Sequence, residues 1–345
     1  MLAVTFALAA AVIVLRFAGA DPVVVFLTGA AALGGLAWVI SVATESIGER
    51  FGPATTGVLQ STLGNLPELF IVLFALAAGE VVVAQTSILG SLFANALFVL
   101  GLAIVAGSWK APDGVMRFHP RLPNDTATLL LLAVFIIVLL GLSDTVGDRA
   151  SRHQVEISAI GAVCLLGVYA VWLTSYLRSP EIAEPALEEA SHATLPFKLA
   201  IALLAASGVG AALVSDFFVE ALDPAVKALG ISKAFTGLVI VAIAGNAVEN
   251  VVGVVLAAKG KSDLAVSVVK NSVAQIAVFL FPALVLLSLF FDARLTFVVG
   301  PVYIGALVIM AIAVWQVTGD GQAVAFEGWA LVALYVILAV LTFFE

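Results

Sequence analysis

The sequence predicts an all-α membrane protein with about eleven transmembrane helices. Of its 345 residues, 63% are hydrophobic and only 11% are charged. The mean hydropathy of +1.19 lies far above the range of water-soluble domains of this length. The apolar residues also fall into runs of about 20, the length that a helix needs to cross a bilayer. Composition, hydropathy and run length therefore agree on a multi-pass protein embedded in lipid.

Eleven apolar segments can be placed along the chain, each long enough for one spanning helix. They cover residues 2–19, 23–47, 54–78, 81–107, 126–143, 154–177, 196–215, 231–258, 264–290, 296–317 and 327–344. The first segment has no basic leader before it and no small-residue cleavage site after it. We therefore expect a retained helix rather than a signal peptide.

The residues that carry redox, zinc or nucleotide chemistry are nearly absent. Cys164 is the only cysteine, and His119, His153 and His192 all fall in predicted loops. This pattern excludes a disulfide framework and a thiolate metal cluster. No HExxH motif, nucleophile elbow or phosphate-binding glycine loop occurs. We expect the protein to be no enzyme, to need no cofactor and to bind no nucleic acid; its surroundings are the lipid bilayer.

Lys and Arg in the predicted loops indicate the orientation. One side of the membrane holds Arg50, Lys110, Arg117, Arg121, Arg178, Lys198, Lys259 and Lys261, and the other holds Arg16, Arg149, Arg152, Lys227, Lys233 and Arg294. The excess on the first side favours a cytoplasmic N-terminus and, with eleven spans, a C-terminus across the membrane. We expect the cell inner membrane as the location.

One acidic stretch, RSPEIAEPALEEASHATLP, separates the sixth and seventh segments. We predict a cytoplasmic linker over residues 178–195. It divides the chain into a leading helix at 1–22, five helices at 23–177 and five helices at 196–345. A solvated connector explains its glutamates, and a regulatory calcium site is the alternative, although the stretch lacks the alternating ligands and central glycine of an EF-hand loop.

A short motif occurs twice in the chain. GNLPE at Gly64–Glu68 aligns with GNAVE at Gly245–Glu249, and the alignment continues without a gap to Ser91 against Ser272. Seven of its 28 positions are identical, among them the glycine, asparagine, glutamate and serine. The offset of 181 residues corresponds to five predicted spans, an odd number that inverts the second copy across the bilayer. We therefore predict two inverted five-helix repeats whose motifs meet near the membrane midplane.

Glu68 and Glu249 place carboxylates inside otherwise apolar spans. An ionised carboxylate at the bilayer centre is costly, so each must be protonated, paired or next to a polar cavity. Asn65 lies three residues before Glu68, and Asn246 lies three residues before Glu249. Each pair therefore shares one helical face and offers a set of oxygen ligands.

Both motifs also contain residues that interrupt a helix. Gly64 and Gly245 allow close approach and local unwinding. Pro67 removes a backbone amide and frees the carbonyl of Leu63, which can turn toward an ion. The second motif has Val248 in the place of this proline, so the device is not duplicated.

Two carboxylates with amide and carbonyl oxygens suit calcium, which accepts six to eight oxygen ligands in flexible geometry. In a dry, empty cavity the same carboxylates bind protons instead. Competition for one site then gives exchange of calcium for protons. A sodium- or potassium-coupled exchanger is the alternative, and it needs additional fixed oxygens. A membrane-embedded hydrolase has no nucleophile with its base and no metal with histidine ligands to support it.

These stretches resemble the calcium/proton antiporters of the cation/calcium exchanger superfamily over the full length of the chain. The similar parts are GNLPEL followed by QTSILGSLFANALFVLG, GNAVEN followed by SVAQIAVFLFP, FTGL before the second motif and VTGDGQ before the last span. The resemblance implies one leading helix plus two inverted five-helix repeats. It also implies secondary active antiport by alternating access, with Glu68 and Glu249 as the shared calcium and proton ligands.

The resemblance further implies a polar shell around the two glutamates. Its members here are Gly64, Asn65, Ser91, Asn95, Gly245, Asn246, Ser272 and Gln275. For the polar side chains among them, a hydrogen bond that packs two helices together is the alternative role.

Lys270 departs from the pattern of that family. The second repeat usually has an apolar residue followed by Gly-Ser, whereas this chain has Lys270, Asn271 and Ser272. One account is a side chain that extends to the near membrane interface. The other is a fixed internal cation that pairs with a carboxylate and lowers the affinity for a divalent ion. Lys270 is thus a candidate modulator of ion selectivity.

Overall fold

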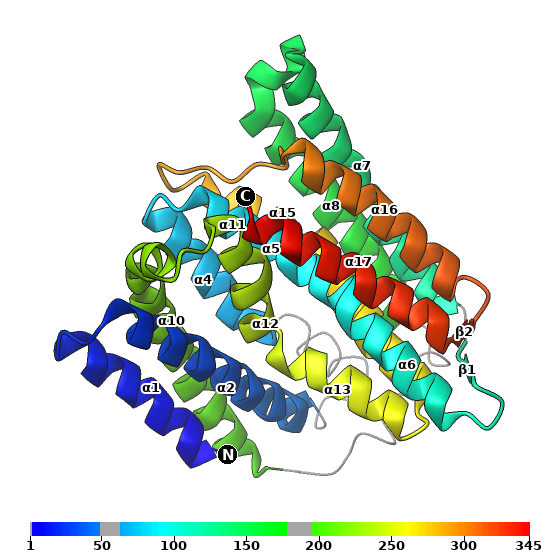
Figure 1. The fold of residues 1–345 in the computed structure, drawn as a ribbon, viewed down its shortest axis with the longest axis horizontal. Helices are drawn as coiled ribbons and strands as arrows, with labels where there is room; N and C mark the ends of the chain where they lie inside the picture. The colour runs from blue at the N-terminus through cyan, green and yellow to red at the C-terminus, as the bar shows by residue number, and fades with distance from the viewer. Residues whose placement is uncertain (1, 49–62, 120, 178–194) are drawn as a thin grey trace. The chain divides into compact units, whose positions relative to one another are not determined.

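The computed structural model describes residues 2–48, 63–119, 121–177 and 195–345 (Figure 1). The linker expected at 178–195, except for its last residue, and the start of the segment expected at 54–78 lie outside these residues. The described chain is helical apart from one two-stranded sheet and short connections. It divides into two compact units, and each unit takes residues from both halves of the sequence.

Unit 1 comprises residues 1–90, 175–248 and 341–345. It contains α1 (Leu2–Phe17), α2 (Pro22–Gly48), α4 (Leu66–Ala77), most of α5 (Val81–Phe93), α10 (Phe197–Leu229), α11 (Lys233–Phe235), the π-helix η3 (Thr236–Val241) and α12 (Ala242–Gly245). α2 packs along α10, where the rings of Phe26 and Phe218 stack with centroids 4.7 Å apart. α10 ends at Leu229, and the next residue, Gly230, has a φ of +66° and forms the left-handed C-cap that glycine adopts without strain.

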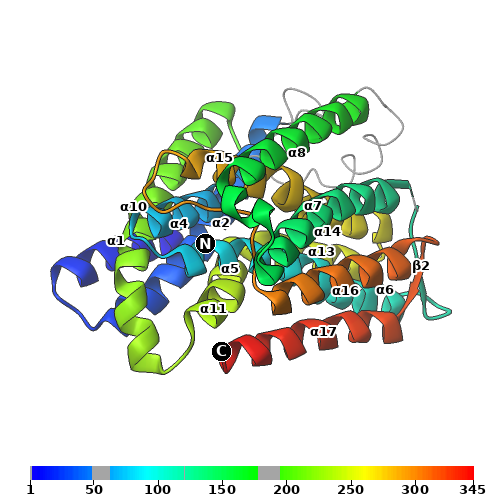
Figure 2. The same ribbon diagram turned by 90° about the horizontal axis from the view of Figure 1, so that it is seen from above.

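Unit 2 comprises residues 91–174 and 249–340. Its main elements are the π-helix η1 (Ala94–Val99), α6 (Leu100–Lys110), β1 (Val115–Arg117), α7 (Arg121–Val146), the 3-10 helix η2 (Arg149–His153), α8 (Gln154–Leu177), α13 (Ala247–Ala258), α14 (Ser262–Gln275), the π-helix η4 (Ile276–Leu280), α15 (Phe281–Ser288), α16 (Pro301–Thr318), β2 (Gln322–Val324) and α17 (Ala325–Phe343). α7 packs against α16, and the two lie side by side in Figures 1 and 2.

Glycine lets α6 and α17 touch through their backbones. A Cβ on Gly101 would lie 2.6 Å from the carbonyl oxygen of Gly328, and a Cβ on Gly328 would lie 2.5 Å from that of Gly101. No side chain fits at such a distance, so only glycine at both positions allows the two helices to approach this closely.

The two strands close one end of unit 2. β1 pairs antiparallel with β2 in the register Val115–Val324, Met116–Ala323 and Arg117–Gln322. The Arg117 guanidinium donates to Asp113 at 2.7 Å, and this hydrogen bond holds the pKa of the Asp113 carboxyl below its ordinary value. The backbone amide of His119 donates to Asp263 in the first turn of α14 at 2.6 Å. The start of α14 therefore lies at the same end of the unit as the sheet.

Eight helices of the described chain are long and apolar enough to cross a membrane. A ninth span results if the helices on either side of Asn246 form one broken span. α1 and α4 are also apolar but have only 16 and 12 residues. The chain is therefore a multi-pass helical membrane protein, and the count of eleven spans stays a prediction.

Two of the π-helices lie at matching places in the sequence repeat. η1 ends at Val99 and η4 ends at Leu280, which are separated by the same 181 residues that relate the two GN motifs. A π-turn widens a helix locally and is frequent at functional sites. Each follows a serine of the aligned stretch, Ser91 and Ser272, by a few residues.

Candidate cation-binding site

The first motif breaks a helix and starts another. Gly64 and Asn65 form a turn, and α4 begins at Leu66 with Pro67 in its first turn. Proline is favoured there because the amide that it lacks has no partner inside the helix. Glu68 is also in the first turn, where the positive end of the helix dipole favours a carboxylate. Glu68 is only 4% exposed, so its carboxylate is buried.

The second motif interrupts its helix at the equivalent position. α12 ends at Gly245, Asn246 leaves helical geometry at φ −103° and ψ 22°, and α13 begins at Ala247. The Asn246 side chain is fully buried and its Nδ2 donates to the carbonyl oxygen of Ala242 at 3.0 Å. In both motifs the helix break thus follows a glycine, the residue type that tolerates irregular backbone geometry.

The two motifs meet at Glu68. Nδ2 of Asn246 donates to Oε1 of Glu68 at 2.5 Å, across 178 residues of sequence. Gly245 lies against the same side chain, because a Cβ placed there would be 2.6 Å from Cγ of Glu68. Only glycine leaves room for the carboxylate in this position. Glu68, Gly245 and Asn246 all belong to unit 1, so the contact lies within one compact body.

Glu249 begins the part of α13 that belongs to unit 2. Its backbone is helical, and its side chain lies outside the described part of the chain. Among the described residues, no group of three or more His, Cys, Asp or Glu side chains is placed to hold a metal ion.

The remaining polar residues of the expected shell are buried. Asn65 belongs to unit 1, and Ser91, Asn95, Ser272 and Gln275 belong to unit 2. Nδ2 of Asn95 donates to the carbonyl oxygen of Ser91 at 3.1 Å, so this hydrogen bond joins two residues one turn apart on the same helix. Polar groups buried in membrane helices are costly unless they pair or serve a ligand.

On α13 and α14 of unit 2, three side-chain oxygens are buried without a hydrogen-bond partner among the described residues. They are Oδ1 of Asn250, Oδ1 of Asn271 and Oγ of Ser272. A buried oxygen without a protein partner is usually explained by a bound water or ion. α13 and α14 are consecutive helices that pack where Gly253 meets Val269, so Asn250 and Ser272 lie at similar levels along this helical hairpin.

Asn250 and Asn271 were not among the shell residues predicted from the sequence. The signal was available, because each is an asparagine inside an apolar helix next to a residue that was assigned, Glu249 or Ser272. Their unpartnered oxygens make them candidates for the same polar region of unit 2.

Lys270 lies in the middle of α14 and is 1% exposed. Its Nζ donates to Oγ1 of Thr318 at 3.2 Å, and Oγ1 of Thr318 in turn donates to the carbonyl oxygen of Val314 at 2.7 Å. Thr318 is the last residue of α16, where the negative end of the helix dipole stabilises a cation. With about 100° per residue, Lys270 points about 200° from Ser272 and about 140° from Gln275 around α14.

Comparison with known proteins places this architecture in a transporter family. The sodium/calcium exchanger protein family matches residues 22–177 and 199–344, which leaves out the stretch around the acidic linker. The chain belongs to this family.

The chain is 30% identical over 342 residues to a Ca²⁺/H⁺ antiporter of Synechocystis sp., with 93% of this chain and 91% of the relative covered. It is 32% identical to the Ca²⁺/H⁺ antiporter ChaA of Bacillus subtilis, with 88% of each chain covered. These relatives are transporters rather than enzymes.

Solved structures agree on the fold. Native YfkE superposes with a TM-score of 0.82 at 28% identity and covers 99% of this chain and 100% of its own. The H⁺/Ca²⁺ exchanger CAX superposes with a TM-score of 0.77 and covers 98% of this chain and 87% of its own, but its 15% identity shows the fold alone.

Proposed function

We propose that the protein exchanges calcium for protons across a membrane by secondary active antiport. The observation that carries this proposal is the buried carboxylate of Glu68, held by Asn246 of the second motif in a chain of the exchanger family. The relatives named Ca²⁺/H⁺ antiporters support the choice of substrates, because they match nearly the whole chain at 30% and 32% identity.

The site itself contains Glu68 and Glu249 as cation and proton ligands. Support for Glu249 comes from the repeated motif, in which it occupies the position of Glu68. The proposed shell adds Asn65, Ser91, Asn95, Asn246, Ser272 and Gln275. Carboxylate and amide oxygens of this kind are the hard ligands that calcium prefers.

Charge balance couples the two substrates. Two ionised carboxylates without a cation are costly to carry through a low-dielectric region. One calcium ion neutralises them, and so does protonation of both groups. The site then switches from one side of the membrane to the other only when it holds calcium or protons. Exchange by alternating access requires this.

The finer architecture belongs to the same proposal. Eleven spans, with a leading helix and two inverted five-helix repeats, follow from the offset of 181 residues between the motifs. The matching ends of η1 and η4 support the repeat. The excess of basic loop residues supports a cytoplasmic N-terminus in the cell inner membrane.

Flux through proteoliposomes tests the proposal. Calcium uptake is recorded with a pH gradient, and separately with a sodium or potassium gradient at equal pH on both sides. We expect uptake driven by the pH gradient and none driven by sodium or potassium. Uptake that needs sodium or potassium would instead establish the alternative, a sodium- or potassium-coupled exchanger of the same fold.

Glu68→Gln and Glu249→Gln test the site. Each removes an ionisable ligand without changing the shape of the side chain, so we expect flux to fall to the level of empty vesicles while the protein stays folded. Glu345→Gln, at the exposed end of the chain, is the matched control and should transport normally. Proton-driven flux retained in either site variant would refute the two-glutamate site.

A further inference from the structure

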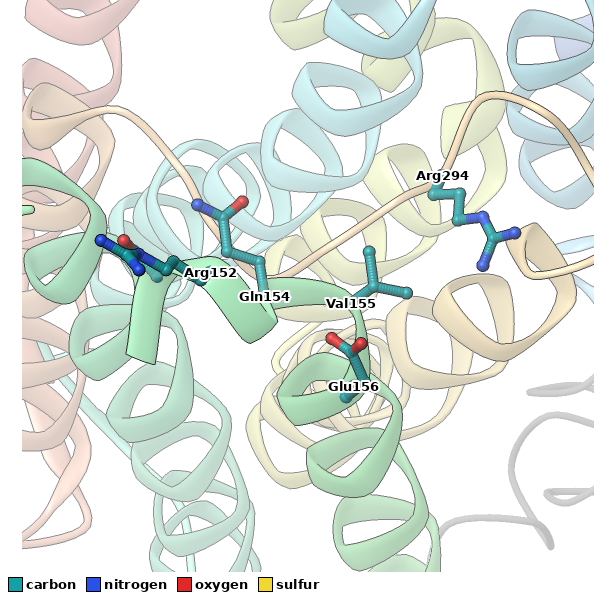
Figure 3. Close-up of a pocket in the computed structure, with 6 residues that line it drawn as sticks. Arg152, Gln154, Val155, Glu156 and Arg294 are labelled. Atoms are coloured by element: carbon teal, nitrogen blue, oxygen red, sulfur yellow. The ribbon is translucent and has the colours of Figure 1, made fainter. Parts of the chain in front are cut away.

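A cleft in unit 2 contains none of the residues of the proposed transport site. Its volume is about 430 Å³, and Ser151, Arg152, Gln154, Val155, Glu156 and Arg294 line it (Figure 3). One wall is the end of η2 and the first turn of α8, and the other is the connection between α15 and α16. The cleft therefore lies at the end of a membrane-spanning helix.

The cleft carries a surplus of positive charge. Figure 3 shows Arg152 and Arg294 on either side of Val155 and Glu156. Both arginines are exposed, and neither forms an ion pair or a hydrogen bond with another described residue. Glu156 is the only carboxylate of the lining, so the lining has a formal charge of +1.

Apolar surface runs from the cleft along the side of the bundle. α8 is a candidate span of which only 28% is buried. Ile160, Val163 and Val171 follow Glu156 at helical spacing on one face and are 65%, 60% and 67% exposed. Phe290, in the connection that carries Arg294, is 88% exposed. A ligand of the cleft thus meets guanidinium groups at one end and exposed apolar side chains of a candidate membrane span at the other.

We propose that this cleft binds the headgroup of an anionic phospholipid. The guanidinium group matches phosphate oxygens by two parallel hydrogen bonds. Basic pockets at the ends of membrane helices are suited to anionic headgroups. A singly charged anionic lipid also neutralises the +1 of the lining, whereas a zwitterionic lipid does not. The acyl chains lie along the exposed face of α8 at Ile160 and Val163.

Native mass spectrometry of the purified full-length protein, titrated with phosphatidylglycerol, tests this site. One interfacial arginine contributes about fivefold in affinity, so the double variant Arg152→Gln with Arg294→Gln should bind about 25-fold more weakly. Arg149→Gln is the matched control, because Arg149 is exposed on η2 but does not line the cleft. It should change binding less than twofold.

Glu156→Gln gives a test of opposite sign. Removal of the only carboxylate of the lining should strengthen phosphatidylglycerol binding severalfold, and this outcome does not depend on the folding of the arginine variants. Equal losses in Arg149→Gln and in the double variant would overturn the site. Tighter binding of phosphatidylethanolamine, weakened by Glu156→Gln, would show a carboxylate that recognises an ammonium group and would refute the anionic lipid. Displacement of the lipid by millimolar inorganic phosphate would point to a free anion and refute it as well.

Discussion

Gly245→Ala tests whether the second motif positions Glu68. A Cβ at residue 245 would lie 2.6 Å from Cγ of Glu68 and 3.3 Å from its Cδ and Oε1. Carbon atoms in contact are about 3.5–4.0 Å apart, so the side chain of Glu68 must move by about 1 Å. A shift of this size breaks or bends the 2.5 Å hydrogen bond from Asn246 to Oε1.

The expected loss follows from that hydrogen bond. A hydrogen bond to a charged group contributes about 1.5–3 kcal/mol, which corresponds to about 10- to 150-fold in a binding constant. We expect the apparent calcium affinity of Gly245→Ala to fall within this range. The folding stability should change little, because alanine favours a helix over glycine by up to about 1 kcal/mol and offsets part of the crowding.

Proteoliposome flux over a range of calcium concentrations measures the half-saturating concentration, and thermal unfolding in detergent measures the stability. Gly208→Ala in α10 is the matched control, since a Cβ there meets no atom within 4 Å. It should transport as the unmodified protein does. Unchanged half-saturation in well-folded Gly245→Ala would show that the contact with Glu68 has no part in calcium binding.

Three further predictions concern the hydrogen bond to Glu68, the coupling to protons and the packing of unit 2. Asn246→Ala removes the donor to Glu68 and should weaken calcium binding by about tenfold or more, read from the same flux curves. The apparent calcium affinity of the unmodified protein should rise as pH increases, because calcium displaces protons from its ligands; a flat profile from about pH 6 to 8 would contradict proton exchange. Gly101→Val should lower the unfolding temperature through its clash with the backbone of α17, whereas Gly305→Ala, which meets nothing within 4 Å, should not.

The local chemistry of the first motif could be predicted from sequence. A glycine, an asparagine and a proline before an intramembrane glutamate predict a helix break, and α4 does begin at Leu66 after such a break. Eight of the expected spans coincide with helices long and apolar enough to cross a membrane, because about 20 apolar residues in a row have few alternatives. α1 and α4 differ from that expectation in length: their described helices have 16 and 12 residues, which is short for a span.

The hydrogen-bond partner of Glu68 could not be predicted from the sequence in the same way. Asn246 was expected to share a helical face with Glu249, three residues away, and this stays a prediction. The structure shows that its amide donates to Glu68 across 178 residues. This contact forms where Asn246 leaves helical geometry, at the break between α12 and α13. Such contacts depend on how helices pack, and hydrophobic periodicity carries no information about pairs so distant in sequence.

Lys270→Leu decides what the buried lysine does. The ammonium group lies at the C-terminal end of α16 with Thr318 as its partner, on the face of α14 away from Ser272 and Gln275. Replacement of a buried charge by an apolar residue of similar volume is often neutral or stabilising. We therefore expect an unfolding temperature equal to or above that of the unmodified protein. We also expect a change in calcium affinity below about threefold, because the ammonium group is bound by Thr318 on the face of α14 away from Ser272 and Gln275. If Lys270 instead pairs with a carboxylate of the transport site, Lys270→Leu tightens calcium binding by tenfold or more and shifts the pH dependence of exchange. Measurement of both quantities on the same preparation separates a structural contact from a fixed internal cation.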